Sequence, residues 1–150
     1  MIVNTTHFGP LDLTDRTVVT FSSGIPGFKE YKSYTVVEVE DSPFLYLQSV
    51  ELGELVFVAV SPFDFFPDYE FDLTDAVIHE LEIKEQSDVI VYNIVTVRGA
   101  LEEATVNLAA PIIINKRTLQ AVQFILQDNR YNIRQRLFPG DTNEKPSDRS

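Results

Sequence analysis

The chain has 150 residues, no cysteine, and 23 acidic against 12 basic side chains, which gives a formal net charge of −11. This composition excludes disulfides and thiol chemistry, and it argues against binding nucleic acid through phosphates, which requires Lys and Arg. No apolar run reaches the ~18 residues of a membrane helix, and no signal peptide is apparent at the N-terminus. A single domain with its own core is expected at this length.

The N-terminal residues are typical of short strands separated by turns. Ile2–Phe8 is predicted as a strand that ends at the Gly9–Pro10 turn. A second strand is predicted over Thr17–Phe21, which is rich in branched side chains. The next segment, Ser22–Phe28, has two glycines around a proline and therefore sets a particular backbone path. Its two large apolar side chains are expected to enter the core.

A hairpin and a further buried strand are predicted next. Tyr34–Glu40 alternates between two faces, Asp41–Pro43 makes a turn, and Phe44–Val50 returns as the partner strand. Leu55–Val60 is apolar at every position, which is typical of a strand that is covered on both sides. Ser61–Pro62 closes this run.

The segment Phe63–Phe71 combines five aromatic and three acidic residues around a proline. One interpretation is that the rings cap the open end of a barrel. The other is that they form a recognition surface, because aromatic residues are enriched at protein interfaces. We expect most of the rings to be buried and only one or two to be exposed.

A short helix is predicted over Leu73–Leu81. Thr74 suits the N-cap, Asp75 suits the first turn, and the apolar residues that follow recur at helical spacing. A polar bridge, Glu82–Asp88, leads from this helix to the central strands.

The two most strand-like runs of the chain are Val89–Val97 and Thr105–Asn115, separated by a polar turn that contains Gly99. Neither face of the first run is fully polar, so this strand is expected to be covered on both sides. We predict a central antiparallel pair. Because Pro111 cannot donate to a β-ladder, it should mark an edge, a bulge or a crossing point.

The C-terminal third continues the strand pattern. Residues 119–127 fit either a helix or a strand, and the surrounding pattern favours a strand. A turn at 128–130 leads into 131–138, and residues 139–150, which are polar or Pro and Gly, are expected to form a flexible tail. The prediction is an all-β fold over residues 1–138, with many short strands that form a closed or nearly closed antiparallel β-barrel-like domain, or a sandwich, and one or two short helices.

The chain carries few groups suited to catalysis. The only histidines are His7 and His79, and neither a zinc-protease helix, a phosphate-binding loop nor a nucleophile elbow is present. Acid pairs such as Asp64 with Asp68 would need a cleft that holds them at different pKa values. We therefore predict that the protein is not an enzyme and uses no metal or cofactor.

Several segments occur in an order and spacing that resemble the flagellar assembly factor FliW family, over most of residues 2–137. The matching segments are Gly24–Phe28, Phe44–Ser49, Pro67–Phe71, Val95–Val97 and Thr105–Asn115. This resemblance implies a β-barrel-like fold, which also favours a strand for residues 119–127. It further implies a cytoplasmic, non-enzymatic protein that works by exchanging partners.

The resemblance also implies the partners. Proteins of this family bind the C-terminal region of flagellin as a chaperone, and the free factor binds the RNA-binding regulator CsrA, which releases flagellin mRNA for translation. The charge distribution suits a basic partner, because residues 51–100 carry eleven acids and two bases. Solubility alone could also explain that acidic stretch. Because the termini of flagellin are amphipathic helices, their site is expected to be an apolar groove with a polar rim.

Two surfaces are candidates for partner binding: the turn 63–69 and a strand face around Tyr34, Tyr46 and Gln48. The predicted partner-binding residues are Tyr34, Glu38, Tyr46, Gln48, Phe63, Asp64, Phe65, Phe66, Asp68, Tyr69 and Glu70. An alternative function is a small-molecule or sugar-binding β-barrel that uses the segment 63–71 and would need an enclosed cavity. A third is an enzyme with paired carboxylates.

Overall fold

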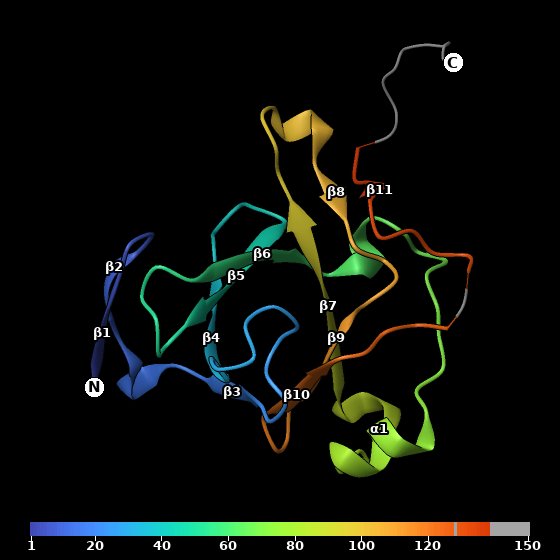
Figure 1. The fold of residues 1–150 in the computed structure, drawn as a ribbon, viewed down its shortest axis with the longest axis horizontal. Helices are drawn as coiled ribbons and strands as arrows, with labels where there is room; N and C mark the ends of the chain where they lie inside the picture. The colour runs from blue at the N-terminus through green and yellow to red at the C-terminus, as the bar shows by residue number, and fades with distance from the viewer. Residues whose placement is uncertain (128, 139–150) are drawn as a thin grey trace.

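The computed structural model describes residues 1–127 and 129–138 (Figure 1). The predicted tail, 139–150, lies outside the described residues. Most of the regular structure is β-strand, as predicted. The strands are β1 (Ile2–Thr5), β2 (Gly9–Asp12), β3 (Val18–Phe21), β4 (Ser33–Glu38), β5 (Phe44–Ser49), β6 (Val56–Val60), β7 (Val89–Thr96), β8 (Thr105–Val106), β9 (Ile112–Asn115), β10 (Gln120–Gln123) and β11 (Gln135–Arg136).

The sheet closes on itself, so the fold is a barrel and not a sandwich. Its ring of neighbouring strands runs β7-β6-β5-β4-β3-β10-β9, and β9 pairs back with β7. The pairs in this ring are antiparallel, except for β3 with β10, which is parallel. Closure leaves few free edges, which limits unwanted pairing with other chains. The all-β, barrel-like prediction is confirmed.

The predicted central pair exists, but its second strand is interrupted. β7 pairs with β8 at Val95↔Val106 and with β9 at Val89↔Asn115. From Val89 to Val95, β7 advances six positions, while its partner advances nine, so the partner carries extra residues in between. Pro111 lies in this interruption and its carbonyl accepts from the Phe124 N–H. The expectation of a bulge or crossing point at this proline is confirmed.

The N-terminal residues form three strands where two were predicted. The expected strand Ile2–Phe8 ends at Thr5, because the Thr5 hydroxyl donates to the Gly9 carbonyl and accepts from the Phe8 N–H. The resulting β1–β2 hairpin is a separate two-stranded sheet, seen at one side of the barrel in Figure 1. It contacts β5, because the rings of His7 and Phe8 pack against Tyr46.

The hairpin lies close to the loop after β5, and this close approach requires a glycine. A Cβ atom at Gly53 would overlap the main-chain carbonyl of Asn4. The Gly53 carbonyl also accepts hydrogen bonds from the Thr6 N–H and from the side-chain amide of Gln48, each at 3.1 Å. Because Gly53 does not adopt the left-handed backbone region, the requirement here is for space.

Replacing Gly53 by Ala is therefore expected to lower the free energy of unfolding by about 2 kcal/mol, the usual cost of overpacking. The loss should be measured by urea denaturation, together with faster hydrogen exchange in the β1–β2 hairpin. The exposed neighbour Glu54, replaced by Ala, is the control. An unchanged unfolding curve with unchanged exchange would show that the hairpin does not depend on this contact.

The barrel interior is filled by side chains. Eleven buried residues make up its main cluster: Val19, Phe21, Ile25, Tyr34, Leu45, Leu47, Leu55, Ala59, Ile112, Ile114 and Ala121. The one α-helix of the described residues, α1 (Asp75–Glu80), covers the outside of β9 and packs around Ile113 through Val77 and Leu81. Thr74 caps this helix by accepting from the Val77 N–H, as predicted. The filled interior argues against the small-molecule alternative.

The ambiguous stretch 119–127 contains a strand, but a shorter one than expected. Leu119 has a positive φ of 63°, so the strand begins at Gln120 and ends at Gln123. Beyond it, Phe124 and Leu126 donate backbone hydrogen bonds to residues 111 and 109. Residues 131–138 then add β11, which pairs with β8.

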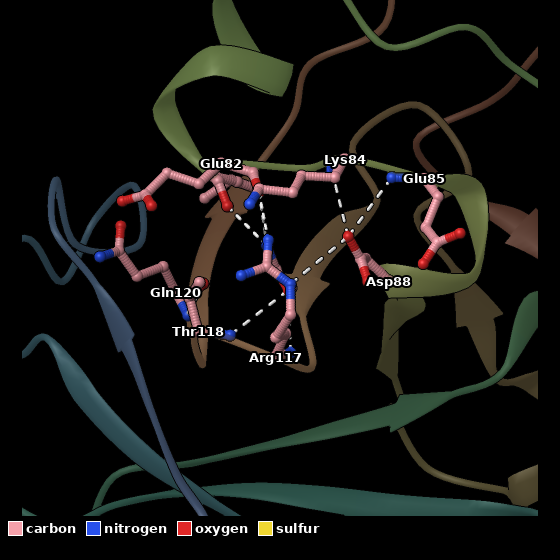
Figure 2. A network of polar contacts seen from close by, with 9 residues as sticks. Glu82, Lys84, Glu85, Asp88, Arg117, Thr118 and Gln120 are labelled. Atoms are coloured by element: carbon pink, nitrogen blue, oxygen red, sulfur yellow. Dashed lines mark hydrogen bonds and ion pairs between the residues drawn. The ribbon is translucent and has the colours of Figure 1, made fainter.

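A polar network joins the end of α1 to the β9–β10 turn. The buried side chain of Asn115 donates to the carbonyls of Leu81 and Glu82, at 2.7 and 3.2 Å. Its oxygen accepts from the Arg117 N–H at 2.8 Å. The Arg117 guanidinium donates to the Glu82 carbonyl at 2.7 Å and lies 3.7 Å from Asp88 (Figure 2). The network holds the segment 81–88 in place, directly before β7 begins at Val89.

Asp88 holds the opposite side of this network. Its carboxylate accepts from the backbone N–H groups of Lys84 and Glu85, which Figure 2 shows converging on one oxygen. The Lys84 hydrogen bond is the largest cause that lowers the Asp88 pKa below its ordinary value, followed by Glu85 and the charge of Arg117. The ionised carboxylate therefore contributes stability at neutral pH, and that stability is lost as the pH falls through its lowered pKa.

Candidate protein-binding groove at the barrel mouth

The candidate site lies where β6 and β7 separate. β6 pairs with β7 from Val58↔Val95 to Val60↔Asn93. Continuing this register would place Pro62 opposite Val91, and a proline has no N–H to donate. The chain instead turns into a 3₁₀ helix, Pro62–Asp64, which stays near β7 but leaves its first half without a paired strand on that side.

One open hollow, of about 660 Å³, lies between this part of β7 and the β4–β5 turn. We call it the inner hollow, because its β7 side chains Ile90 and Tyr92 also pack against the barrel core. Its lining residues are Glu38, Val39, Glu40, Ser42, Pro43, Phe44, Leu45, Ser61, Phe63, Asp64, Val89, Ile90, Val91 and Tyr92. As far as the chain is described, this lining holds three acids and no Lys or Arg.

The electrostatics of the inner hollow are therefore negative. Glu38, Glu40 and Asp64 are all exposed and approach the hollow from two segments, the end of β4 with its following turn and the 3₁₀ helix after β6. Burial, followed by the charge of Glu38, raises the pKa of Tyr92 above its ordinary value. Such a site favours cationic side chains and disfavours phosphate.

A second hollow, of about 580 Å³, lies on the other side of the same strand, between β7 and α1. We call it the outer hollow. Its lining residues are Phe63, Tyr69, Glu70, Phe71, Asp72, Leu73, Ile78, Ile83, Lys84, Glu85, Gln86, Val89 and Val91. The floor is apolar and the rim is polar, with three acids and one lysine.

Phe63, Val89 and Val91 line both hollows and form the strip between them. Phe63 is 44% exposed, and its ring centroid lies 6.0 Å from that of Tyr69. A large aromatic side chain held at the border of two hollows is the kind of residue that dominates binding energy at interfaces.

Apart from Phe63, the aromatic residues predicted in the segment 63–71 are buried or partly buried. Tyr69 is only 4% exposed, and its hydroxyl donates to the Leu108 carbonyl at 2.7 Å. Phe65 and Phe66 are partly buried, and Phe65 meets Phe138 with 5.8 Å between the ring centroids. Most of the rings are therefore buried, as expected, but they pack with Val60 and Val95 on the outer face of β6 and β7. The interpretation that they cap the open end of the barrel is wrong, because the barrel core takes the alternate side chains of these strands, Ala59 and Ile94. Asp68 and Glu70 are exposed beside them, and Glu70 lies on the rim of the outer hollow.

The second predicted surface, around Tyr34, Tyr46 and Gln48, does not exist as a surface. Tyr34 is buried in the barrel interior and contacts the Phe21 ring. Gln48 is 1% exposed, because its amide donates to three main-chain carbonyls. Tyr46 is partly covered by the β1–β2 hairpin. The prediction that Tyr34 and Gln48 lie at the surface is wrong. Tyr34 packs in the barrel interior, and Gln48 is buried by its hydrogen bonds to the loop after β5.

The structure thus brings together Glu38, Phe63 and Asp64 of the predicted set. Sequence reasoning missed Glu40, Val89, Val91 and the apolar floor supplied by residues 73–83. One signal for the opening was present in the sequence, since Pro62 follows the apolar run 55–60 after a single residue, Ser61, and must end its pairing.

The buried tyrosines give a pH prediction. Burial is the largest cause that raises the pKa of Tyr69, and also that of Tyr34, to about 12 from an ordinary value near 10. In the unfolded chain these groups ionise near pH 10, so stability should be constant below pH 10 and should fall as the pH rises towards 12.

Replacing Tyr69 by Phe should weaken this alkaline dependence. It should also cost about 1 kcal/mol at neutral pH, because the hydrogen bond to Leu108 is lost. Urea unfolding at a series of pH values measures both effects. An alkaline slope equal to that of the unmodified protein would show that Tyr69 ionises freely in the folded state.

The described residues offer little for catalysis. Within residues 1–127 and 129–138, no three His, Asp or Glu side chains come together in a way that could hold a metal ion. In the same part of the chain, no helix combines the length and the apolar character needed to span a membrane. What the site presents is an acidic and aromatic surface suited to holding another polypeptide.

Comparisons with known proteins agree on one family. The family model described as FliW protein matches residues 2–137. The flagellar assembly factor FliW of Caldicellulosiruptor bescii is 42% identical over 137 residues, covering 91% of this chain and 90% of that protein. The Bacillus subtilis protein of the same name is 42% identical over 132 residues, covering 87% and 92%.

A solved structure agrees in fold as well as in sequence. A crystal structure of the flagellar assembly factor FliW superposes with a TM-score of 0.87 at 39% identity, covering 95% of this chain and all of the other. The resemblance read from the short motifs is thus confirmed over nearly the whole chain. This protein belongs to the FliW family of flagellar assembly factors.

Proposed function

We propose that this protein is a cytoplasmic assembly factor that binds the C-terminal region of flagellin as a chaperone. When free, it binds the translational regulator CsrA and relieves repression of flagellin mRNA. Membership of the FliW family supports this role. The single structural observation that carries it is the pair of hollows at the barrel mouth, which share one aromatic strip.

The outer hollow suits the flagellin segment. An amphipathic helix needs an apolar groove with a polar rim, and the hollow floored by Phe71, Leu73, Ile78 and Ile83 has that character. Its rim acids, Glu70, Asp72 and Glu85, can form ion pairs with lysine side chains along the border of a bound helix.

The inner hollow suits CsrA. A protein that binds RNA presents a basic face, and the three acids of this hollow offer a complementary field. A docked acidic protein also repels RNA through its own charge. Interference by a shape change and interference by direct blocking are both consistent with this arrangement.

The shared strip accounts for exchange between the two partners. Because Phe63, Val89 and Val91 line both hollows, two occupants would meet at these side chains. Binding of one partner is then expected to exclude the other, so that the release of flagellin frees the site for CsrA.

The test is complex formation on a sizing column, with purified CsrA and with flagellin. Both should co-elute with this protein, and rising salt should weaken the CsrA complex. The combined variant Glu38→Gln, Glu40→Gln and Asp64→Asn should lose CsrA. The control removes three exposed acids from elsewhere: Glu54→Gln, Glu102→Gln and Glu103→Gln. No co-elution with either partner would end the proposal, as would equal loss in both triple variants.

A further inference from the structure

The first half of β7 has a free backbone edge. The Ile94 carbonyl accepts from the Asn107 N–H, and the Asp88 carbonyl accepts from the Lys116 N–H. The peptide groups of the even-numbered residues of β7 therefore point towards β8 and β9. In an antiparallel sheet, alternate residues point their peptide groups to opposite sides. The N–H and C=O groups of Val89 and Val91 therefore point away from β9, towards the space that is left where the chain turns at Pro62.

These peptide groups have no strand opposite them. The Val89 N–H donates to the Gln86 carbonyl. Among the described residues, no hydrogen bond reaches the Val91 N–H, the Val91 carbonyl or the Val89 carbonyl from the β6 side. Natural edges are usually blunted by lysine or proline. Here the unpaired stretch is Val89, Ile90 and Val91, with no lysine or proline, and only its shortness protects it from unwanted pairing.

The two hollows flank this edge. Side chains of a strand alternate between the two faces of its sheet. A segment paired with β7 here would therefore point successive side chains into the inner hollow and into the outer hollow. Main-chain hydrogen bonds with pockets for alternate side chains are how proteins recognise an added strand.

The charges and the apolar surface of the two hollows indicate which side chains a bound segment should carry. The inner hollow offers Glu38, Glu40 and Asp64 and, as described, no base, while the outer hollow has an apolar floor. We propose that β7 receives an extended segment of a partner protein as an added strand, with Lys or Arg side chains in the inner hollow and large apolar side chains in the outer one. This goes beyond the proposed function, because it concerns an extended segment that spans both hollows, whereas the flagellin helix was placed in the outer hollow alone.

The test uses a fluorescent peptide in which Lys alternates with Ile or Val, and the full protein, with binding followed by anisotropy. N-methylation of the residues whose amides face β7 should weaken binding about tenfold or more per bond lost, whereas N-methylation of the other alternate set should not. A slip by one residue cannot rescue the first peptide, because it would exchange the two faces. A peptide with Glu in place of Lys should not bind.

A protein variant tests the same edge from the other side. Val91→Pro removes the N–H that faces the opening and leaves the bonds to β9, so the barrel should stay folded while peptide binding falls. If this variant does not fold, the two N-methylated peptides still decide the question.

Equal binding of both N-methylated peptides would overturn the proposal. So would indifference to peptide charge, no binding at millimolar concentration, or a dimer of this chain paired through β7. Neither CsrA nor flagellin enters the assay, so its result is independent of the proposed function.

Discussion

Replacing Asn115 by Ala is expected to lower the free energy of unfolding by about 3 kcal/mol. The side chain is completely buried, and its amide donates to the Leu81 and Glu82 carbonyls. Its oxygen accepts from the backbone N–H of Arg117 and, more weakly, of Thr118. Truncation leaves the buried Leu81 carbonyl without a partner, which costs about 1–3 kcal/mol, and it also removes the acceptor of the partly buried Arg117 N–H.

The isosteric change Asn115→Asp separates hydrogen bonding from volume. A carboxylate oxygen would then face two carbonyl oxygens, so this variant should lose at least as much stability at neutral pH and regain part of it in mild acid, when the group becomes protonated. Urea unfolding measures both, with the exposed Asn4→Ala as a control expected within about 0.5 kcal/mol. If Asn115→Ala unfolds like the control, the hydrogen bonds of Asn115 to the Leu81 and Glu82 carbonyls do not hold α1 to the barrel.

Replacing Phe63 by Ala is expected to weaken binding of both partners about 30-fold, which corresponds to about 2 kcal/mol. Phe63 borders both hollows and is 44% exposed. For that reason the same change should alter the free energy of unfolding by only about 0.5 kcal/mol. Titration calorimetry with CsrA and with a flagellin C-terminal fragment measures the affinities.

The matched control is Ile125→Ala, which truncates a side chain that is 59% exposed and lines neither hollow. Its affinities should equal those of the unmodified protein. Loss of only one partner with Phe63→Ala would show that the two sites do not share the strip. Equal losses in Phe63→Ala and Ile125→Ala would show that binding does not depend on the barrel mouth.

Local patterns in the sequence were sufficient for most of the strands. The alternation over 34–40 and the branched run at 89–97 each produced a strand, because such side chains suit a pleated surface. The helix at 75–80 and its Thr74 cap were also predictable, since capping is a local interaction. Pro111 interrupted pairing, as its missing N–H required.

The candidate site depended on long-range contacts that no local pattern contains. Gln48 looked like a surface residue, but the loop after β5 brings main-chain carbonyls to its amide. Tyr34 alternates like a half-exposed residue, yet closure through the parallel β3–β10 pair places it in the interior. The inner hollow combines segments near residues 40, 62 and 90, and its opening follows from the register that sets Pro62 opposite Val91.

The measurement that tests the account most directly is amide hydrogen exchange of the folded protein, alone and with CsrA or flagellin bound. The amide of Val91 faces the opening between the hollows, and each partner should slow its exchange while leaving the β1–β2 hairpin unchanged. Protection confined to the hairpin around Tyr46, with Val91 exchanging as in the free protein, would contradict the placement of the binding site at the barrel mouth.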